Sequence, residues 1–568
     1  MSPFGRLTRF FFSRLFESEL MPPGLPQVRL VIWSAALILG PGLYLPVNMW
    51  GTYVYLNAWH PERLQPTIWG DKVQLLLLAM IPAGLISLVI WDGVFPDRRD
   101  AHILSAMPLR NRLLVVSRLA ALGLVLASIA FGVALPIGLL YGTLVADYQA
   151  GFIRAFFAHV IGSGLASAFV FCTLLAVQSI LVTITRGRWV HRLIVWGQFA
   201  AVILLLQMVI FRGTMVRNLR AMLEAGIEQP GGAMAWSPPL WFLGLSEVIS
   251  GAPQDVFRML AWRGLVATVV TAAAAVLLYV IGYRRLVHRA LETQDVPLAV
   301  APGALRKLIV GRLVGPLSTA RPVAGAVLGF VLTSFARSRR HRLLYGIYIG
   351  VGCAIVVAGL LRAAALGPRG AEFLSPSILS IALVITFLGA VGARVLFAIP
   401  IDPSANWVFR MTERSSMRSH VAGARLALLL IAAAPPIALL LPASAMFWGP
   451  AVAAAHAAYV LTLAWLLVEM LMWRFGRVPF TAPYVPGAAN VRLLWPLYLT
   501  LFTTYAYTMA ELEAWLLARP ALFAPTVVAI AGTAVTVSRI SARLSDSKPL
   551  AFEAEPEDEA TTLALSSP

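Results

Sequence analysis

Residues 94–118 read Val-Phe-Pro-Asp-Arg-Arg-Asp-Ala-His-Ile-Leu-Ser-Ala-Met-Pro-Leu-Arg-Asn-Arg-Leu-Leu-Val-Val-Ser-Arg, and they join two long apolar runs. One charged side chain at the centre of a bilayer costs at least about 2.5–3.5 kcal/mol. The charged residues between 97 and 112 therefore predict a polar connection between two membrane spans. Arginine is enriched in connections on the cytoplasmic side, so we expect this connection to be cytoplasmic.

The apolar residues of this connection recur at helical spacing. Ile103, Leu104 and Met107 would lie on one face of a short helix, and Pro108 disfavours helical backbone at the residue before it. The pattern predicts a short amphipathic helix lying across the cytoplasmic end of a helical hairpin.

Composition identifies an integral membrane protein. Of the 568 residues, 59% are hydrophobic and only 12% are charged, whereas soluble chains are about 25% charged. The mean hydropathy is +0.80. Apolar runs about 20 residues long, without the alternation of a barrel, predict helical spans. The expected fold class is therefore all-α, with the lipid bilayer as solvent.

The net charge of +19 would suggest a nucleic-acid partner for a soluble protein. In a membrane protein it is better explained by arginines that hold cytoplasmic loops against anionic headgroups. We therefore expect no nucleic-acid partner. Cys172 and Cys353 both fall inside apolar runs, so neither a disulfide framework nor a metal site is predicted.

About twelve transmembrane helices are predicted, in two six-helix halves. We expect an interfacial helix in 1–29, the first half in 30–283, a cytoplasmic linker with a second interfacial helix in 284–342, the second half in 343–543, and a disordered acidic tail in 544–568. The alternative for the N-terminus is a disordered basic arm. The spans are placed near 30–49, 73–95, 113–142, 155–184, 193–211, 264–283, 343–361, 377–399, 426–448, 450–473, 495–517 and 525–543.

We also predict the local structure of three stretches that lie between or within these spans. Residues 50–71 are predicted to form a polar loop. In 212–262, the apolar stretch Leu240–Ile249 is too short to cross and is expected to be re-entrant or interfacial. The pair Pro435-Pro436 is expected to break or kink its span.

The distribution of basic residues predicts the orientation. Counted together with Arg539 and Arg543 at the inner end of the last span, the predicted cytoplasmic segments hold 32 of the 45 lysines and arginines, and the predicted outer loops hold 8. This bias places both termini in the cytoplasm. Arginine greatly outnumbers lysine, which suggests a bacterium with a GC-rich genome and hence the bacterial cytoplasmic membrane.

The two halves share a sparse internal repeat. Asp97 precedes Arg118-Leu-Ala by 21 residues, and Asp402 precedes Arg425-Leu-Ala by 23 residues. Each half would then consist of an interfacial helix, two spans, an inward polar connection and four further spans. Two such units are typical of transporters with a pseudo-twofold axis along the membrane normal.

This plan resembles the type-2 export permeases of ABC (ATP-binding cassette) transporters, the membrane-spanning subunits. The resemblance implies that residues 4–18 form the elbow helix, that 97–112 contain the coupling helix which docks on an ATPase subunit, and that 212–262 contain short re-entrant helices. In the second half the last outer loop, 518–524, is too short for such helices. A homodimer, or a pseudo-dimer within one chain, would complete the pathway.

The candidate functional residues fall into two groups. Candidates for ATPase coupling are Asp97, Arg98, Arg99, Asp100, Ile103, Leu104 and Met107, with Asn406, Trp407 and Arg410 in the second half. Candidates for the transport pathway are the carboxylates Glu469, Glu511 and Glu513, because intramembrane ionisable residues usually mark function. The alternative is that Glu511 and Glu513 only reach the outer interface.

The chain lacks a phosphate-binding loop of the G-x-x-x-x-G-K-[ST] type and any Cys/His metal spacing. We therefore expect a non-enzymatic transport subunit without a cofactor, whose ATP binds to the partner. Two other functions are open. One is a secondary transporter of the major-facilitator kind, although its G-x-x-x-D-R-x-G-R-R pattern is poorly met at 97–100. The other is a membrane-embedded enzyme, although residues 50–71 offer only Glu62 and Asp71 as acids.

Overall fold

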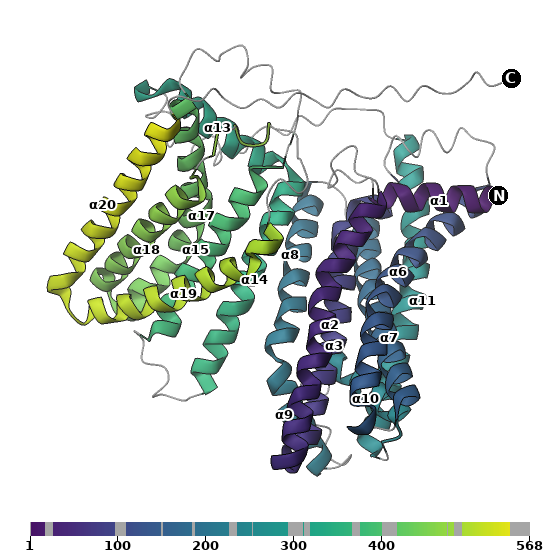
Figure 1. Cartoon of the computed structure of the whole chain (residues 1–568). Coiled ribbons are helices and arrows are strands. Elements are labelled where there is room, and N and C mark those ends of the chain that lie inside the picture. Colours follow the sequence, from purple (N-terminus) through teal and green to yellow (C-terminus); the bar gives the residue numbers. More distant parts are fainter. Residues whose placement is uncertain are drawn as a thin grey trace. The chain divides into compact units, whose positions relative to one another are not determined.

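The computed structural model of the chain is all-helical, with no strand in the residues it describes (Figure 1). These residues are 2–16, 27–96, 110–148, 151–184, 188–225, 236–252, 254–292, 319–365, 375–399, 417–473 and 491–545, with a few isolated positions between them. The chain divides into two compact units, Met1–Pro297 and Leu298–Pro568.

The first unit is a bundle of long helices. Its helix α7 contacts α3, α6, α10 and α11, and thus forms the centre of the bundle. Helix α1 lies crosswise to the long helices at one end of this bundle (Figure 1). The elements are α1 (Pro3–Phe16), α2 (Gln27–Trp59), α3 (Pro61–Val89), α4 (Trp91–Val94), α6 (Asn111–Val145), α7 (Phe152–Ile184), α8 (Arg188–Ile210), α9 (Arg212–Ala225), α10 (Pro238–Ser250) and α11 (Asp255–Glu292).

The second unit is also a bundle of long helices. Helix α15 contacts α14, α17, α18 and α19, and α18 also contacts α20. The elements are α13 (Pro322–Arg337), α14 (Arg339–Ala365), α15 (Pro376–Leu396), α17 (Met417–Trp448), α18 (Pro450–Leu471), α19 (Val491–Leu517) and α20 (Pro520–Ser545).

The chain is a multi-pass membrane protein. Within the described residues, eight helices are long and apolar enough to cross a bilayer, or nine if the bent pair Ala200–Val209 and Arg212–Glu224 is one span. Every one of the twelve predicted spans overlaps a helix, but the count of twelve remains a prediction. The eight are Pro61–Leu88, Asn111–Tyr148, Phe152–Thr183, Asp255–Leu286, Pro376–Leu396, Arg418–Trp448, Pro450–Leu471 and Pro520–Arg543.

One expectation about local structure is wrong, and a second is narrowed. Residues 50–71 are not a loop, because α2 continues to Trp59 and α3 begins at Pro61. Proline suits the first position of a helix, where its missing N–H has no partner to lose. At the pair Pro435-Pro436 the span is not broken, since α17 runs through both residues, and a kink there stays a prediction. Membrane helices tolerate proline because neighbouring groups satisfy the freed carbonyls.

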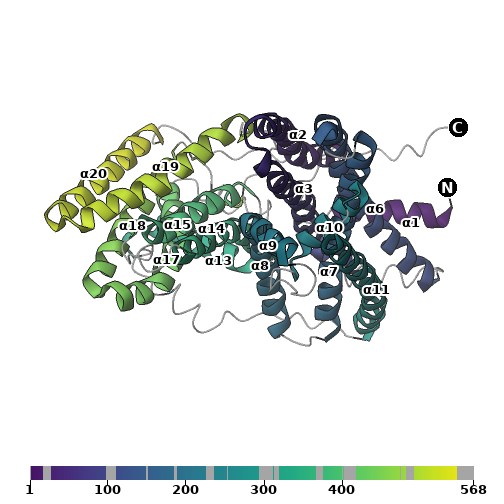
Figure 2. The ribbon, with the colours of Figure 1, turned by 90° about the horizontal axis from the view of Figure 1, so that it is seen from below.

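Helix α10 matches the expected short segment. Its 13 residues extend about 20 Å at 1.5 Å per residue, whereas the hydrocarbon core is about 30 Å thick. Helix α10 lies beside α3, α7 and α11 (Figure 2). Leu240, Phe242 and Leu243 are fully buried there, so the segment is part of the bundle core of the first unit.

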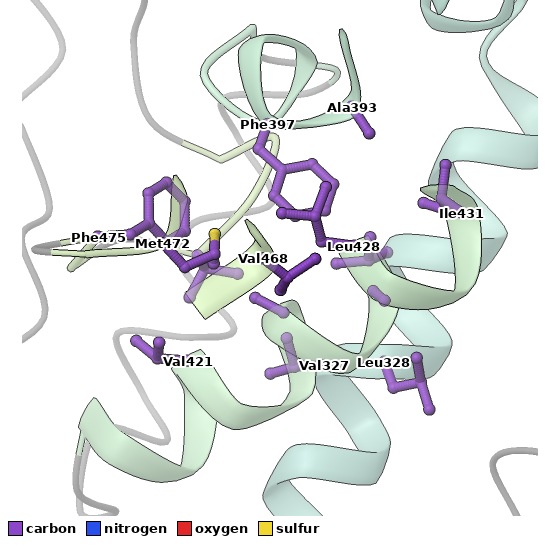
Figure 3. Close-up of a cluster of buried hydrophobic side chains, with 14 of the residues drawn as sticks. Val327, Leu328, Ala393, Phe397, Val421, Leu428, Ile431, Val468, Met472 and Phe475 are labelled. Carbon is purple, nitrogen blue, oxygen red and sulfur yellow. The ribbon is translucent and has the colours of Figure 1, made fainter. Parts of the chain in front are cut away.

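A hydrophobic cluster packs α13 against the other helices of the second unit (Figure 3). Val327 and Leu328 of α13 belong to one buried cluster with Phe397, the residue just after α15, Leu428 of α17 and Val468 of α18. The apolar face of α13 is therefore covered by the second unit, and helix α13 begins close to the N-terminal turns of α17.

Candidate functional site

The predicted coupling helix lies outside the described residues, and so do all seven of its candidate side chains: Asp97, Arg98, Arg99, Asp100, Ile103, Leu104 and Met107. Both ends of the segment are described. Residues 91–96 lead into it from α3 and α4, and α6 begins just after it at Asn111. The site is therefore defined by how these two ends are held.

Three carbonyl groups at the end of α4 are bonded by side chains from three different helices. The last carbonyls of a helix have no partner within the helix. Gln178 of α7 donates from Nε2 to the carbonyl oxygen of Trp91 at 2.5 Å. Arg118 of α6 donates from Nη2 to the carbonyl oxygen of Gly93 at 3.1 Å.

The third donor is Tyr279 of α11, whose hydroxyl lies 3.0 Å from the carbonyl oxygen of Val94. Its ring stacks on Phe95 with ring centroids 5.0 Å apart. The chain entering 97–109 is thus tied to α6, α7 and α11 at once. A displacement of this entry must move these three helices or break the bonds.

The N-terminal helix covers the same region. Phe11 and Leu15 are each 2% exposed, and they belong to a hydrophobic cluster with Val94 and Leu114. The guanidinium of Arg118 lies over the Phe11 ring, 5.1 Å from its centroid. Helix α1 therefore packs against both ends of the predicted coupling segment.

The second predicted coupling segment, with Asn406, Trp407 and Arg410, also lies outside the described residues. The end of α15 leads towards it. His341 of α14 donates from Nε2 to the carbonyl oxygen of Ile399 at 3.1 Å. The N–H of Ile401 donates to the carbonyl oxygen of Phe480 at 3.0 Å, and the N–H of Phe480 donates to that of Phe397 at 3.1 Å. This entry is likewise anchored to distant parts of its unit.

Glu469, the first pathway candidate, is buried and paired. Its Oε2 lies 3.1 Å from Nη1 of Arg425, and the two side chains are 5% and 13% exposed. Arg425 also donates to the hydroxyls of Ser538 at 3.3 Å and Ser541 at 2.7 Å. Arg425 was identified in the sequence only as a repeat position, so its pairing with Glu469 was missed.

Glu513 and Glu511 differ in burial although they are two residues apart on α19. Glu513 is fully buried and its Oε1 lies 2.6 Å from Nδ1 of His456 on α18. Glu511 is exposed. His456 and Glu469 are 13 positions apart on α18, which is about 20 Å along the helix. The three pathway candidates therefore do not form a single site.

A buried ion pair in the first unit was also missed. Lys72 of α3 lies with Nζ 2.5 Å from Oε1 of Glu247 on α10, and the side chains are 7% and 8% exposed. Ser246 beside it donates to the carbonyl oxygen of Ala158 on α7 at 3.1 Å. The signal in the sequence was a glutamate inside the short apolar stretch Leu240–Ile249, where a charge needs a partner.

Comparison of the chain with models of protein families, with curated proteins and with solved structures found no match.

Proposed function

We propose that this chain is the membrane-spanning permease subunit of an ABC-type exporter, coupled to a separate ATPase subunit. The proposal includes twelve spans in two six-helix halves, both termini in the cytoplasm, and a bacterial cytoplasmic membrane. ATP binds to the partner, and this subunit carries the substrate pathway. The halves act as a pseudo-dimer, or two chains assemble as a homodimer.

The observation that carries the proposal is the anchoring of the entry to 97–109. An ATPase that binds this segment has to move several spans together to open or close a pathway. The bonds from Gln178, Arg118 and Tyr279 tie the entry to α7, α6 and α11. Each hydrogen bond contributes about 0.5–1.5 kcal/mol to the stability of this anchoring. Because closely packed helices are hardly compressible, a displacement of the entry would be passed on to the helices that it contacts.

The contacts of the two units support the internal duplication. Helix α1 packs on α6, as α13 packs on α17. The pairs α3 with α7 and α7 with α11 in the first unit have counterparts in α15 with α18 and α18 with α20. An interfacial helix against the span after each polar connection is therefore common to both units, which favours two equivalent ATPase contacts, at 97–112 and at 402–418.

The role of 97–112 is tested by Leu104→Asp. An interface gains most of its energy from a few buried apolar anchors, so a carboxylate at this position would abolish association with the ATPase. The measurement is purification of the full chain from native membranes in mild detergent, followed by identification of co-purified ATPase subunits by mass spectrometry. The control is Ala150→Asp, which adds the same charge five residues after the end of α6 in the sequence and should leave association unchanged.

Two results would contradict the proposal. One is a wild-type chain that co-purifies with no ATPase subunit at all, which would favour the secondary transporter. The other is a Leu104→Asp protein that inserts normally and retains the ATPase at the wild-type ratio, which would remove the coupling role from this segment.

A further inference from the structure

The two units carry a histidine and a glutamate at corresponding positions. In the first unit, His159 lies seven residues after the start of α7, and Glu247 lies eight residues before the start of α11. In the second unit, His456 lies six residues after the start of α18, and Glu513 lies seven residues before the start of α20. Helix α7 contacts α10 and α11, as α18 contacts α19 and α20. Each unit therefore has the two residues on helices with the same order and the same contacts.

In the first unit, a lysine supplies the positive charge of this site. The Nζ atom of Lys72 lies 2.5 Å from Oε1 of Glu247, and the two side chains are 7% and 8% exposed. Lys72 also acts electrostatically on the imidazole of His159. The ammonium and the carboxylate cancel, so this site is neutral while His159 holds no additional proton.

Helix α15 of the second unit provides no such lysine. It contacts α18 as α3 contacts α7, and its one charged residue is Arg394 in the last turn. Arg394 donates from Nε to the carbonyl oxygen of Leu471 at 3.0 Å. Leu471 ends α18 and follows His456 by 15 positions, which is about 22 Å along the helix. The charge of α15 therefore lies far from the pair of His456 and Glu513.

The other groups around this pair add no positive charge to it. The phenols of Tyr459 and Tyr505 act electrostatically on Glu513, and the ring of Trp448 lies 5.4 Å from the imidazole of His456. The remaining charged residues of α17 to α20 are exposed, as Glu511 and Arg519 are, or lie at the opposite ends of their helices, as do Arg418, His420, Arg425, Glu469, Arg492, Arg539 and Arg543. Within the described residues, His456 is therefore the group that can carry positive charge beside Glu513.

The geometry of the pair leaves its charge incomplete without an additional proton. Nδ1 of His456 lies 2.6 Å from Oε1 of Glu513, and this hydrogen bond contains one hydrogen. If that hydrogen belongs to a neutral imidazole, the pair keeps the full negative charge of the carboxylate. Oε2 of Glu513 is buried and has no hydrogen-bond partner in the part of the chain that the structure describes. A buried carboxylate without a counter-charge is so costly that it becomes neutral instead.

Burial limits which ligand can neutralise this carboxylate. The side chains of His456 and Glu513 are 7% and 0% exposed, which closes the pair to a metal ion or an amine. A proton needs no cavity. His456 is the more exposed partner and lies in the second turn of α18, so its imidazole is the group through which a proton can enter and leave.

We propose that the pair of His456 and Glu513 binds one exchangeable proton, which supplies the charge that Lys72 supplies in the first unit. The proton makes the imidazole cationic or the carboxyl group neutral, and the pair has no net charge in either form. It belongs to the pair rather than to one residue. The two units thus carry corresponding sites, one neutralised by a fixed ammonium and the other by a proton from solution.

The test is the pH dependence of unfolding of the full-length chain. An imidazole in an unfolded chain loses its proton above about pH 6.5, whereas the folded pair keeps it. The folded state then binds more protons, so stability falls as the pH rises. The measurement is unfolding by sodium dodecyl sulfate in mixed micelles at pH 7 and pH 8, followed by tryptophan fluorescence.

His456→Lys places a fixed ammonium beside Glu513 and imitates the first unit. Lysine stays charged in both states over this pH range. From pH 7 to pH 8, the ratio of folded to unfolded chain should therefore fall about tenfold more in the wild type than in this variant. Glu513→Gln removes the carboxylate instead and should abolish the same excess pH dependence, so the comparison does not depend on either variant alone.

Two controls separate this pair from other titrating groups. Glu511→Gln, at an exposed position of α19, should keep the pH dependence of the wild type. His159→Gln should keep it too, because Lys72 already neutralises the site in the first unit.

The proposal is overturned if the wild type, His456→Lys and Glu513→Gln share one pH dependence between pH 7 and pH 8. Loss of the excess dependence in His159→Gln would also overturn it, because the proton would then be bound in the first unit. None of these measurements uses an ATPase, so they succeed or fail independently of the transport function proposed above.

Discussion

At the scale of single residues, buried ion pairs in both units join side chains that are far apart in the sequence. Lys72 and Glu247 are 175 positions apart and bridge α3 to α10. A buried ion pair is weak evidence for net stability, but removal of one partner leaves an uncompensated charge. The pair therefore holds α10 in register against α3.

This pair predicts a characteristic double-mutant cycle. Lys72→Met alone and Glu247→Leu alone should each destabilise the protein by about 3–5 kcal/mol, because each leaves one buried charge. The double variant should recover most of the loss, because no charge remains. The measurement is thermal unfolding of the purified chain in detergent, followed by the fluorescence of its tryptophans.

An exposed pair provides the control. Arg258 and Asp255 lie 3.1 Å apart with side chains 67% and 64% exposed, and such pairs contribute about 0–1 kcal/mol. Arg258→Met should therefore leave the unfolding temperature almost unchanged. If the losses of the two single variants at the buried pair simply add in the double variant, Lys72 and Glu247 are not coupled.

The sequence revealed which residues are unusual but not how they pair. Glu469 and Glu513 were recognised as intramembrane carboxylates because they interrupt apolar runs. Their partners, Arg425 and His456, come from other turns and other helices, and helix packing decides which side chains meet. Gln178 and Tyr279 are ordinary members of apolar helices in the sequence, and only the fold brings them to the end of α4.

At the scale of helices, close backbone contacts decide which elements stay together. Gly423 of α17 faces the backbone of α13, and a Cβ at this position would lie 3.0 Å from Cβ of Val327 and 3.1 Å from the carbonyl carbon of Ala324. Backbone atoms cannot turn aside as a side chain can. Glycine at 423 is therefore what allows α13 to lie flat on α17.

We predict that Gly423→Ala destabilises the second unit by about 1–3 kcal/mol, the usual cost of overpacking. The matched control is Gly532→Ala in α20, where a Cβ would meet nothing within 4 Å. Thermal unfolding of both variants in the same detergent measures the difference. An equal effect of the two substitutions would show that the contact between α13 and α17 does not constrain the helix.

The helices themselves were largely predictable, and the error at 50–71 has a physical cause. Hydropathy indicates where a chain enters and leaves the hydrocarbon core, but not whether the polar residues between two spans are helical. The polar residues 50–71 were therefore predicted to be a loop, whereas α2 and α3 continue as helices on either side of His60. The same reasoning predicted that Leu240–Ile249 is too short to cross, and α10 has only 13 residues. It could not show that this segment would be buried within a bundle.

At the scale of the whole molecule, the distribution of charge makes a prediction about orientation. The predicted cytoplasmic segments, with the inner end of the last span, hold 32 lysines and arginines and the predicted outer loops hold 8. A reversed topology would place this excess outside, against the rule that basic loops stay in the cytoplasm. The termini, 97–112 and 284–342 should then be cytoplasmic, and 212–262 should face outwards.

Labelling of single cysteines in intact cells tests this orientation. Cys172 and Cys353 are first replaced by alanine, and a cysteine is then introduced at Ser105 or at Pro230. A membrane-impermeant maleimide should label position 230 in intact cells, because 212–262 is predicted to face outwards, and should label position 105 only after the cells are permeabilised. The permeabilised sample shows that both positions are reactive, so that failure to label intact cells reports location. Labelling of position 105 but not 230 in intact cells would reverse the topology and remove 97–112 from the reach of any cytoplasmic ATPase.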